Sequence, residues 1–518
     1  PTWTQKRKLS PFYLYKDLHK NPDYAPVRYD SESYPAFAAE LGGGIMATYD
    51  RRPIVLPKSV DALINRCLGS GANGIGYYMY HGGSTPKGKG GFLSDEAVGA
   101  TKISYDFQAP IGEFGQTKES YHRLKLIHYF LNSFGNHLAT MTTVLPKTNA
   151  DIEPDDTETL RYAVRHRGDS GFLFINNFQD HKSTKDKEGI QIEVKTADGP
   201  LLIPENGGFS LQSDENAIFP FNFDLSGVQL NYATAQLLTK SEDEEDFYYV
   251  FFAPDGVRPQ FSFGASEELK IVNSANTKIQ SNGERWLVDC PADGPSEFIL
   301  KKDGRQIKVL VVDKKFALKS WPVAIENRKH LLFTDADVLQ RPQGIALISK
   351  EKNKIELFAY PKIESAPTSD HGSLSRKSKN KLMSHFEAAL PETPLAFTSS
   401  KTNDRRLVVS LDGGMPDNLH DVILKIDYTG DTAMGFLANE LVVDEFYKGM
   451  PWEIGLRHFI RNKGAEEMNF YFRPIFENAP FLVDLKEENK PDFSAKKTMV
   501  RIGNITFVPV YKTRLEFR

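Results

Sequence analysis

The sequence predicts an α/β part followed by a much longer all-β part. Within residues 34–139, strand and helix patterns alternate, and each strand pattern ends in glycines. From about residue 145 the helical patterns stop, and short runs of Val, Ile, Phe and Tyr alternate with turn clusters such as Asp198-Gly and Asn282-Gly. The 35 Phe and 21 Tyr residues among 518 also suit large β-sheets.

The α/β part is expected to contain two strands and two helices. A strand over 34–41 carries Glu40 at its end, directly before Gly42-Gly43-Gly44. Ser59 is the expected N-cap of a helix that Gly69 and Gly71 close. A fully buried strand follows over 73–80, and after a long loop over 84–116, Thr117 opens a second helix. This order is two βα units, which is typical of a β/α barrel.

The composition narrows the class of protein. The formal net charge is −4 with acids and bases interspersed, and no long basic stripe indicates nucleic acid as a partner. No run approaches the roughly 18 apolar residues of a membrane span. Two cysteines, Cys67 and Cys290, exclude a disulfide framework. The first residue is Pro1 rather than Met, so we expect the natural chain to begin earlier.

Three features of the β part give specific structural expectations. The acidic stretch Ser241–Asp246 is expected at a solvated hairpin tip. Residues 364–380 are polar and basic and predict a linker or flexible loop. Trp452, in the last β region, fits either a core position or a sugar platform, and the core is favoured.

Glu40 is the first candidate for chemistry, because the ends of barrel strands carry catalytic groups and the glycines leave room for a ligand. The alternative is a buried Glu paired with Arg51 or Arg52. Glycoside cleavage needs two carboxyl groups, and Asp106 and Glu113 follow the second strand. Each has a structural alternative, Asp106 as a group that holds its loop together and Glu113 as a helix-start residue.

Metal chemistry has less support in the sequence. The twelve histidines are scattered, and no HExxH pattern occurs. His81 fits either a bond to a sugar hydroxyl or a bond to its own glycine loop. No metal or organic cofactor is expected.

Three motifs together resemble a known family. Ala39–Gly44, Tyr78–Ser84 and Ser104–Gly115 are similar, in this order, to three signatures of the β-galactosidases of glycoside hydrolase family 35. Downstream, Gly171–Phe178 and Asp444–Leu456 resemble the family's β-sandwich and jelly-roll domains. The resemblance implies the last two βα units of a TIM-type (β/α)8 barrel, followed by β-sandwich and jelly-roll domains.

The expected domains follow from that resemblance. Their bounds are 1–141 for the C-terminal part of the catalytic barrel, 142–363 for the β-rich region, 364–380 for the linker and 381–518 for the jelly-roll-like domain.

The resemblance also implies an activity, an exo-acting retaining β-galactosidase. Glu40 matches the nucleophile, and Tyr78, His81, Tyr105 and Phe107 would line the substrate pocket. The family's acid/base is the Glu of an Asn-Glu pair, and the one such pair here, Asn439-Glu440, lies in the jelly-roll region and is rejected. The pattern therefore places the acid/base before Pro1, so a missing N-terminal barrel segment is an expected partner and the chain alone is expected to be inactive.

Three departures from the family pattern bear on specificity. Ile45 stands where the family has Trp, Ser84-Thr-Pro86 replaces Thr-Asn-Phe, and Phe107 replaces a Tyr that faces substrate. The lost hydroxyl removes a hydrogen bond of about 0.5–1.5 kcal/mol. The identity of the sugar therefore stays open.

The expected partner is a glycan with terminal β-linked galactose, in a periplasmic or secreted setting. Two alternatives remain. One is a retaining β-glycosidase for another hexose, and the other is a non-catalytic carbohydrate-binding protein on a decayed barrel.

Overall fold

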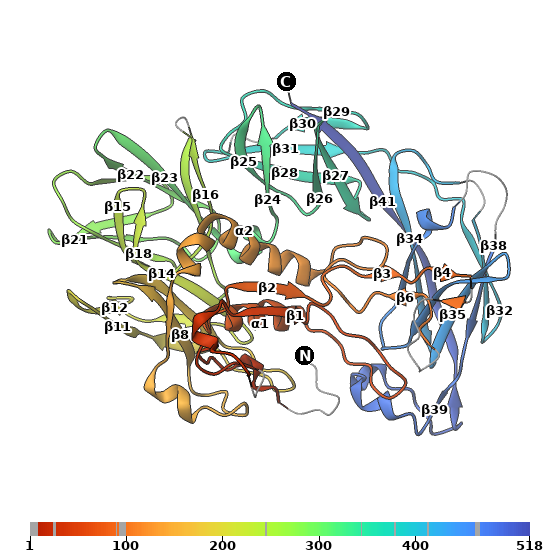
Figure 1. The fold of residues 1–518 in the computed structure, drawn as a ribbon. Helices are drawn as coiled ribbons and strands as arrows, with labels where there is room; N and C mark the ends of the chain where they lie inside the picture. Colours follow the sequence, from red (N-terminus) through yellow and green to blue (C-terminus); the bar gives the residue numbers. More distant parts are fainter. Residues whose placement is uncertain are drawn as a thin grey trace.

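The chain consists mostly of β-sheet, with a small α/β region between two larger β regions (Figure 1). The computed structural model describes residues 9–23, 27–89, 91–92, 100–243, 246–342, 344–377, 380–411, 414–460 and 467–517. In Figure 1 the red and orange α/β region lies between the yellow and green sheets on one side and the blue sheets on the other. Within the described residues, no helix is long and apolar enough to cross a membrane.

The α/β region has the predicted order of elements. Strands β1 (Phe37–Leu41) and β2 (Gly74–Tyr77) pair in parallel, with Leu41 opposite Tyr77. Helix α1 (Pro57–Gly69) connects them, and α2 (Glu119–Ala139) follows β2. The alternation of strand and helix is therefore confirmed, whereas the closed barrel stays a prediction.

Two local predictions in this region were wrong. The first helix begins at Pro57 and not after Ser59: Leu56 is its N-cap, and the Ser59 hydroxyl donates to the Leu56 carbonyl at 2.5 Å. Proline suits this position because the first helical N–H has no partner within the helix. Strand β2 is half-buried rather than fully buried, because β1 is its one neighbour in the described sheet.

The expected loop over 84–116 contains short ladders. Strand β3 (Gly83–Ser84) pairs with β6 (Ser104–Tyr105), and β4 (Lys87–Gly88) pairs with β5 (Gly91–Phe92). The β3–β6 ladder brings the end of the His81-Gly-Gly-Ser84 motif beside the start of Ser104-Tyr-Asp-Phe107.

The first large β region contains an eight-stranded and a five-stranded sheet. In spatial order the eight-stranded sheet is β20 (Lys278–Ser281), β21 (Arg285–Asp289), β18 (Gln260–Gly264), β15 (Val228–Ala233), β14 (Asn216–Leu225), β9 (Ser170–Asn176), β8 (Arg161–Arg167) and β7 (Thr142–Val144). The five-stranded sheet is β16 (Gln236–Asp243), β17 (Asp246–Ala253), β23 (Arg305–Asp313), β22 (Ser296–Lys302) and β19 (Lys270–Ala275). The tip between β16 and β17 lies outside the described residues, but Asp243 pairs with Asp246, as the hairpin prediction requires.

Strand β9 shows why the eight-stranded sheet is a middle layer. Phe172 and Phe174 pack in one core with the helices α1 and α2, whereas Leu173 and Ile175 pack in another. Successive side chains of a strand point to opposite faces, so both faces of β9 are covered. The second core contains two antiparallel pairs, β10 (Lys187–Ile190) with β13 (Phe209–Leu211) and the hairpin of β11 (Ile192–Thr196) with β12 (Gly199–Ile203).

The described part of the second large β region contains three large sheets and one two-stranded sheet. The first is β24 (Ser320–Ile325), β25 (Arg328–Phe333), β28 (Lys354–Tyr360), β31 (Ser384–Ala389) and β30 (Ser373–Arg376). The next is β26 (Asp337–Arg341), β27 (Gly344–Lys350), β41 (Arg501–Glu516), β34 (Leu419–Thr429) and β37 (Trp452–Gly455), with β29 (Thr368–Ser369) on β41. The third is β32 (Thr398–Asn403), β33 (Arg406–Ser410), β38 (Glu467–Phe472), β35 (Thr432–Leu437) and β36 (Glu440–Phe446), and β39 (Ile475–Phe476) pairs with β40 (Thr498–Met499).

Short helical turns complete the described elements. They are α3 (Lys314–Ala317) and the 3₁₀ turns η1 (Pro11–Tyr13), η2 (Ser31–Ser33), η3 (Lys147–Asp151), η4 (Leu456–His458), η5 (Pro480–Asp484) and η6 (Glu487–Asn489).

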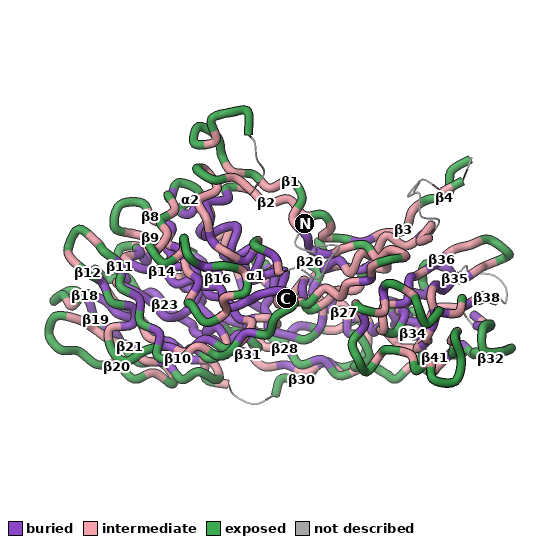
Figure 2. The backbone as a smooth tube through the Cα atoms, turned by 90° about the horizontal axis from the view of Figure 1, so that it is seen from below, coloured by how far each residue is buried: buried purple, intermediate pink, exposed green. Residues whose placement is uncertain are grey.

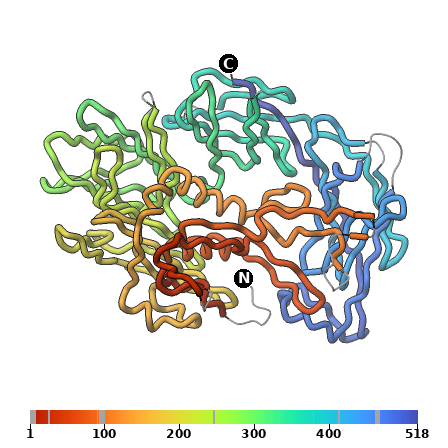
Figure 3. The backbone as a smooth tube through the Cα atoms, viewed as in Figure 1, coloured from red at the N-terminus to blue at the C-terminus, as the bar shows by residue number. Residues whose placement is uncertain are grey.

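The expected linker over 364–380 is partly built into sheets. Strand β30 pairs with β31, and β29 pairs with β41, which returns from the blue region to lie beside β27 (Figure 3). One hydrophobic core extends from Trp321 to Leu515, across this segment. The polar composition that predicted a linker reflects edge positions, because β30 is mostly exposed (Figure 2) and one of the two residues of β29 is exposed. The division into domains stays a prediction.

A buried charge cluster joins the helices to the first β region. Arg123 on α2 donates to Asp61 of α1 at 2.9 Å and to Glu215, just before β14, at 3.0 Å. Lys314 of α3 also bonds Glu215, and all four side chains are at most 5% exposed. Burial alone would raise the pKa of Glu215, but the charges of Lys314 and Arg123 outweigh it and lower the pKa to about 2.

Candidate functional site

Glu40 lies near the carboxyl end of β1, and its side chain is exposed. The register between β1 and β2 shifts between Ala38 and Leu41, a type of irregularity that re-aims side chains. The amide of Tyr78 donates to the carbonyl of Leu41 at 2.9 Å, so the residue after Glu40 holds the first residue beyond β2. Glu40 and Tyr78 therefore stand at the same edge of the parallel pair.

The glycines after Glu40 allow the chain to pass close to two other segments. A Cβ atom on Gly43 would lie 2.3 Å from the carbonyl oxygen of Met79, and one on Gly44 would lie 2.2 Å from that of Phe107. Both contacts are backbone contacts that a side chain could not relieve. The glycines thus bring the Glu40 strand end against the segments that carry Tyr78 and Phe107.

Three of the predicted site residues form one aromatic group. The hydroxyls of Tyr78 and Tyr105 are hydrogen-bonded to each other, and the ring of Phe107 stacks on that of Tyr105 with centroids 4.2 Å apart. Tyr78 meets Phe107 edge to face at 6.2 Å. Phe107 has a φ of 48°, a left-handed conformation that is uncommon outside glycine and recurs at functional sites.

His81 takes the second of its two predicted roles. Its Nδ1 atom is hydrogen-bonded to the carbonyl of Gly82, in its own glycine loop. The side chain is exposed and is not part of the aromatic group of Tyr78, Tyr105 and Phe107. Its role toward a ligand stays a prediction.

The alternative prediction for Glu40, a buried pair with an arginine, was wrong. Arg51 forms a two-point ion pair with Asp484, with distances of 2.8 and 2.9 Å. The guanidinium of Arg52 is buried, pairs with Asp431 and lies over the ring of Phe481 at 3.3 Å from its centroid. Both arginines therefore anchor the loop after Glu40 to the second large β region.

A carboxylate of the second β region also holds the segment before Tyr105. Asp444 on β36 accepts hydrogen bonds from the backbone amides of Ile103 at 3.1 Å and Ser104 at 2.8 Å, and it also bonds the amide of Lys102. The side chain is buried. Three consecutive amides bound to one carboxylate define the path of this segment into the aromatic group.

Replacing Asp444 by Ala should release these three amides. We expect hydrogen exchange at residues 102–104 to become about tenfold faster or more, because their common acceptor is lost. Exchange measured by mass spectrometry on peptides that cover 100–108 checks this. The control is Glu440→Ala on the same strand, where the side chain is 65% exposed. Unchanged exchange in Asp444→Ala would contradict the proposed restraint.

Asp106 holds its loop together, as one of its two predicted roles requires. It accepts from the backbone amides of Gln108 at 3.0 Å and Glu113 at 2.8 Å, and it pairs with Lys118 at 2.7 Å. Burial acts to raise its pKa, but Lys118 and these bonds lower the pKa below its usual range.

Glu113 does not start a helix, because α2 begins at Glu119. Its carboxylate accepts from the Ser84 hydroxyl at 2.5 Å. Burial raises the pKa of Glu113 to about 7, and the carboxylates of Asp106 and Asp444 add to the rise. A carboxyl group that is partly protonated at neutral pH can both donate and accept a hydrogen bond.

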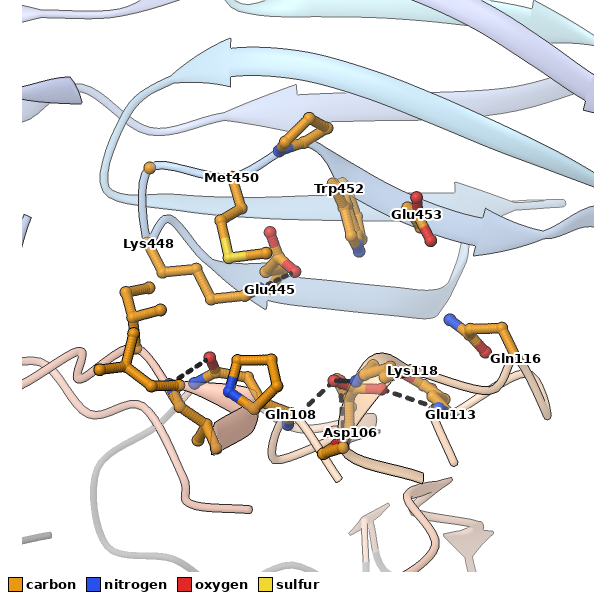
Figure 4. Close-up of a pocket in the computed structure, with 18 of the residues that line it drawn as sticks. Asp106, Gln108, Glu113, Gln116, Lys118, Glu445, Lys448, Met450, Trp452 and Glu453 are labelled. Carbon is orange, nitrogen blue, oxygen red and sulfur yellow. Dashed lines mark hydrogen bonds and ion pairs between the residues drawn. The ribbon is translucent and has the colours of Figure 1, made fainter. Parts of the chain in front are cut away.

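A cavity of about 490 Å³ lies between the α/β region and the second β region (Figure 4). We call it the junction cavity. Asp106, Glu113 and Lys118 line one side, and Glu445, Lys448 and Trp452 line the other. Trp452 is buried and belongs to the hydrophobic core, as the sequence favoured.

The roles of Asp444 and Glu445 were missed in the sequence. Both stand in the segment Asp444–Leu456, whose sequence resembles a jelly-roll domain and contains no catalytic motif. Asp444 lies 340 residues from Ser104 along the chain, so no spacing rule links the two.

Two family models match consecutive parts of the chain. The family described as "Glycosyl hydrolases family 35" matches residues 5–131, which include Glu40 and the aromatic group, and "Beta-galactosidase, domain 2" matches residues 141–319. The chain is thus similar to the family 35 glycosyl hydrolases over residues 5–131 and to the second domain of β-galactosidases over residues 141–319.

Individual relatives are also named as β-galactosidases. The "Probable beta-galactosidase B" of Penicillium rubens is 24% identical over 320 residues, which are 60% of this chain and 30% of the relative. The protein of that name from Aspergillus fumigatus is 24% identical over 370 residues, 65% of this chain and 35% of the relative. The chain spans about a third of the length of these relatives.

One aligned solved structure is too dissimilar to indicate a common fold. A rhamnosidase from Novosphingobium sp. PP1Y aligns with 76% of this chain and 26% of its own length at 9% identity, with a TM-score of only 0.15.

Proposed function

We propose that the protein is a glycoside hydrolase, an exo-acting retaining β-galactosidase in which Glu40 is the nucleophile. The observation that carries the proposal is the exposed Glu40 near the end of β1, at the same edge as Tyr78 and followed by glycines that pass against the backbone of Met79 and Phe107. The match of this same region to family 35 supports the reaction class. The same proposal includes a periplasmic or secreted location. It also includes a β/α barrel that a further segment completes.

In this mechanism Glu40 attacks the anomeric carbon and forms a covalent glycosyl–enzyme intermediate. Water then attacks the same carbon and releases the sugar with retained configuration. A second carboxyl group donates a proton to the leaving oxygen and later removes one from the water, and we assign it to a segment outside this chain. The exposed ring of Tyr78 and the Tyr105–Phe107 stack offer apolar faces for the sugar ring.

A mechanism-based fluorinated galactoside tests the proposal directly. In the full-length protein the reagent should leave a 2-deoxy-2-fluorogalactosyl group on the peptide that contains Glu40, seen by mass spectrometry after digestion. Labelling at another residue, or an active enzyme that is not labelled, would overturn the assignment of Glu40. A panel of aryl β-glycosides then distinguishes galactose from another β-linked hexose.

A further inference from the structure

The segment 104–108 separates two different environments. Tyr105 and Phe107 stack on each other and contact Tyr78, whereas Ser104, Asp106 and Gln108 line the junction cavity. The segment turns at Phe107 and Gln108, which have φ values of 48° and 56°, and it contributes rings to the aromatic group and polar side chains to the lining of the cavity. Among the described residues, neither Glu40 nor Tyr78 lines the junction cavity.

Three acidic side chains of the cavity lining are paired with lysines. Asp106 pairs with Lys118 at 2.7 Å, and Glu445 pairs with Lys448 at 2.6 Å. Glu453, also in the lining, pairs with Lys350 at 3.0 Å. A charged ligand would have to compete with these internal pairs. A neutral ligand with many hydroxyl groups meets donors and acceptors side by side.

One acceptor in the lining lacks a partner. The Oε2 atom of Glu445 bonds Lys448, but its Oε1 atom is buried without a hydrogen bond to any described residue. A buried carboxylate oxygen without a donor costs free energy, and rotation of the Glu445 carboxylate toward the cavity would let a ligand hydroxyl satisfy it. Figure 4 shows Glu445 and Met450 from one side of the cavity facing Asp106 and Glu113 from the other.

Apolar surface completes the lining. Residues 54–57 and the ring of Phe114 form part of the wall, and the side chain of Met450 is 45% exposed. Sugars combine apolar C–H faces with a rim of hydroxyls, and a pocket with an apolar wall and a few placed polar groups suits them. A cavity of about 490 Å³ is within the range of small-molecule sites.

We propose that the junction cavity is a second saccharide-binding site, separate from Glu40, for a neutral sugar unit. Hydroxyls of the sugar bind Glu445 and Glu113, and its apolar face packs on Phe114 and Met450. The ligand class follows from the lining, and only the choice of a galactoside as the probe rests on the proposed function. The site would hold a distal part of a glycan, or another glycan chain, near the catalytic region.

Two methionines provide separate reporters for the two sites. Met450 lines the junction cavity, and Met46, which is 41% exposed, follows the glycine loop after Glu40. The full chain is labelled with ¹³C-methyl methionine, and the two signals are assigned with Met450→Leu and Met46→Leu. The titrant is methyl 1-thio-β-D-galactoside, whose sulfur linkage resists hydrolysis. We expect the Met450 signal to shift saturably.

Matched variants separate binding in the cavity from other effects. Glu445→Gln should raise the midpoint of the Met450 shift about tenfold, because a bond to a charged acceptor is weakened. Glu440→Gln, on the same strand but 65% exposed, should leave the midpoint unchanged.

The other outcomes contradict either the second saccharide-binding site or the proposed function. A shift of Met46 alone would overturn the second site and favour binding near Glu40. No shift of Met450 up to the solubility limit of the sugar, or equal midpoints in Glu445→Gln and wild type, would also overturn it. Failure of Glu40 to be labelled, with the Met450 shift intact, would overturn the proposed function and leave the second site standing.

Discussion

Replacing Glu40 by Gln is expected to lower the hydrolysis of an aryl β-galactoside by about 10³-fold or more in the full-length protein. The amide is nearly isosteric with the carboxylate but cannot form the covalent intermediate that divides the reaction into two easier steps. The measurement is kcat/KM with wild type and variant prepared in parallel, together with loss of labelling by the fluorinated galactoside.

The surroundings of Glu40 indicate that this substitution should change the chemistry of the side chain without changing the fold. Within the described residues the exposed side chain of Glu40 has no hydrogen bond or ion pair, so the variant should fold with unchanged stability. Glu32→Gln, in the exposed turn η2, is the matched control and should retain full activity. Activity within about threefold of wild type in Glu40→Gln would exclude the nucleophile role. Sugar binding without turnover in both proteins would favour the non-catalytic alternative.

The largest effect on stability is expected for Arg123→Met. The substitution leaves Asp61 and Glu215 buried with Lys314 as the remaining fully buried cation of the cluster. Removing one partner from a buried ion cluster typically costs about 3–5 kcal/mol, because a charge is left uncompensated. Urea denaturation at neutral pH measures the loss, and the transition midpoint should fall accordingly.

Two further variants test whether the loss of stability in Arg123→Met comes from the buried charge cluster. Arg167→Met removes an exposed arginine and should change the free energy of unfolding by less than about 0.5 kcal/mol. Glu215→Gln in the Arg123→Met background restores the balance between Asp61 and Lys314, so it should recover at least about 1 kcal/mol. A single variant as stable as wild type, or a double variant less stable than Arg123→Met, would contradict this account.

The pH dependence of the wild type follows from the same cluster. Because the pKa of Glu215 is lowered to about 2 in the folded state from an ordinary value of 4.5, its contribution is fully present above pH 4.5. That contribution decreases as the pH falls from 4.5 toward 2, since the unfolded chain then binds the proton more readily.

Local patterns in the sequence predicted the order of elements well. Strand, helix, strand and helix follow one another as expected, and the β region begins where the helical periodicity stops. Helix and strand periods are properties of short windows, so they need no knowledge of distant residues. The same approach failed at 364–380, where edge strands have the polar composition of a linker.

The candidate site was predicted in part for the same reason. Glu40, Tyr78, Tyr105 and Phe107 stand in short motifs at strand ends, and the structure brings the three aromatic residues into contact. The alternative role of Asp106, as a group that holds its loop together, was also predicted correctly. The raised pKa of Glu113 could not be predicted from the sequence. It results from burial, and burial depends on how the β regions pack around the side chain.

The sequence by itself determined the order of the α/β elements, the resemblance to a family and the short motifs that contain the candidate residues, because these are encoded within a few tens of residues. Only the tertiary structure decided what holds those motifs in place. Asp444 binds the amides before Tyr105, and Asp431 and Asp484 anchor the loop after Glu40, each across more than 300 residues of chain. Such contacts, and the junction cavity between the two regions, arise from packing of surfaces that no local pattern connects.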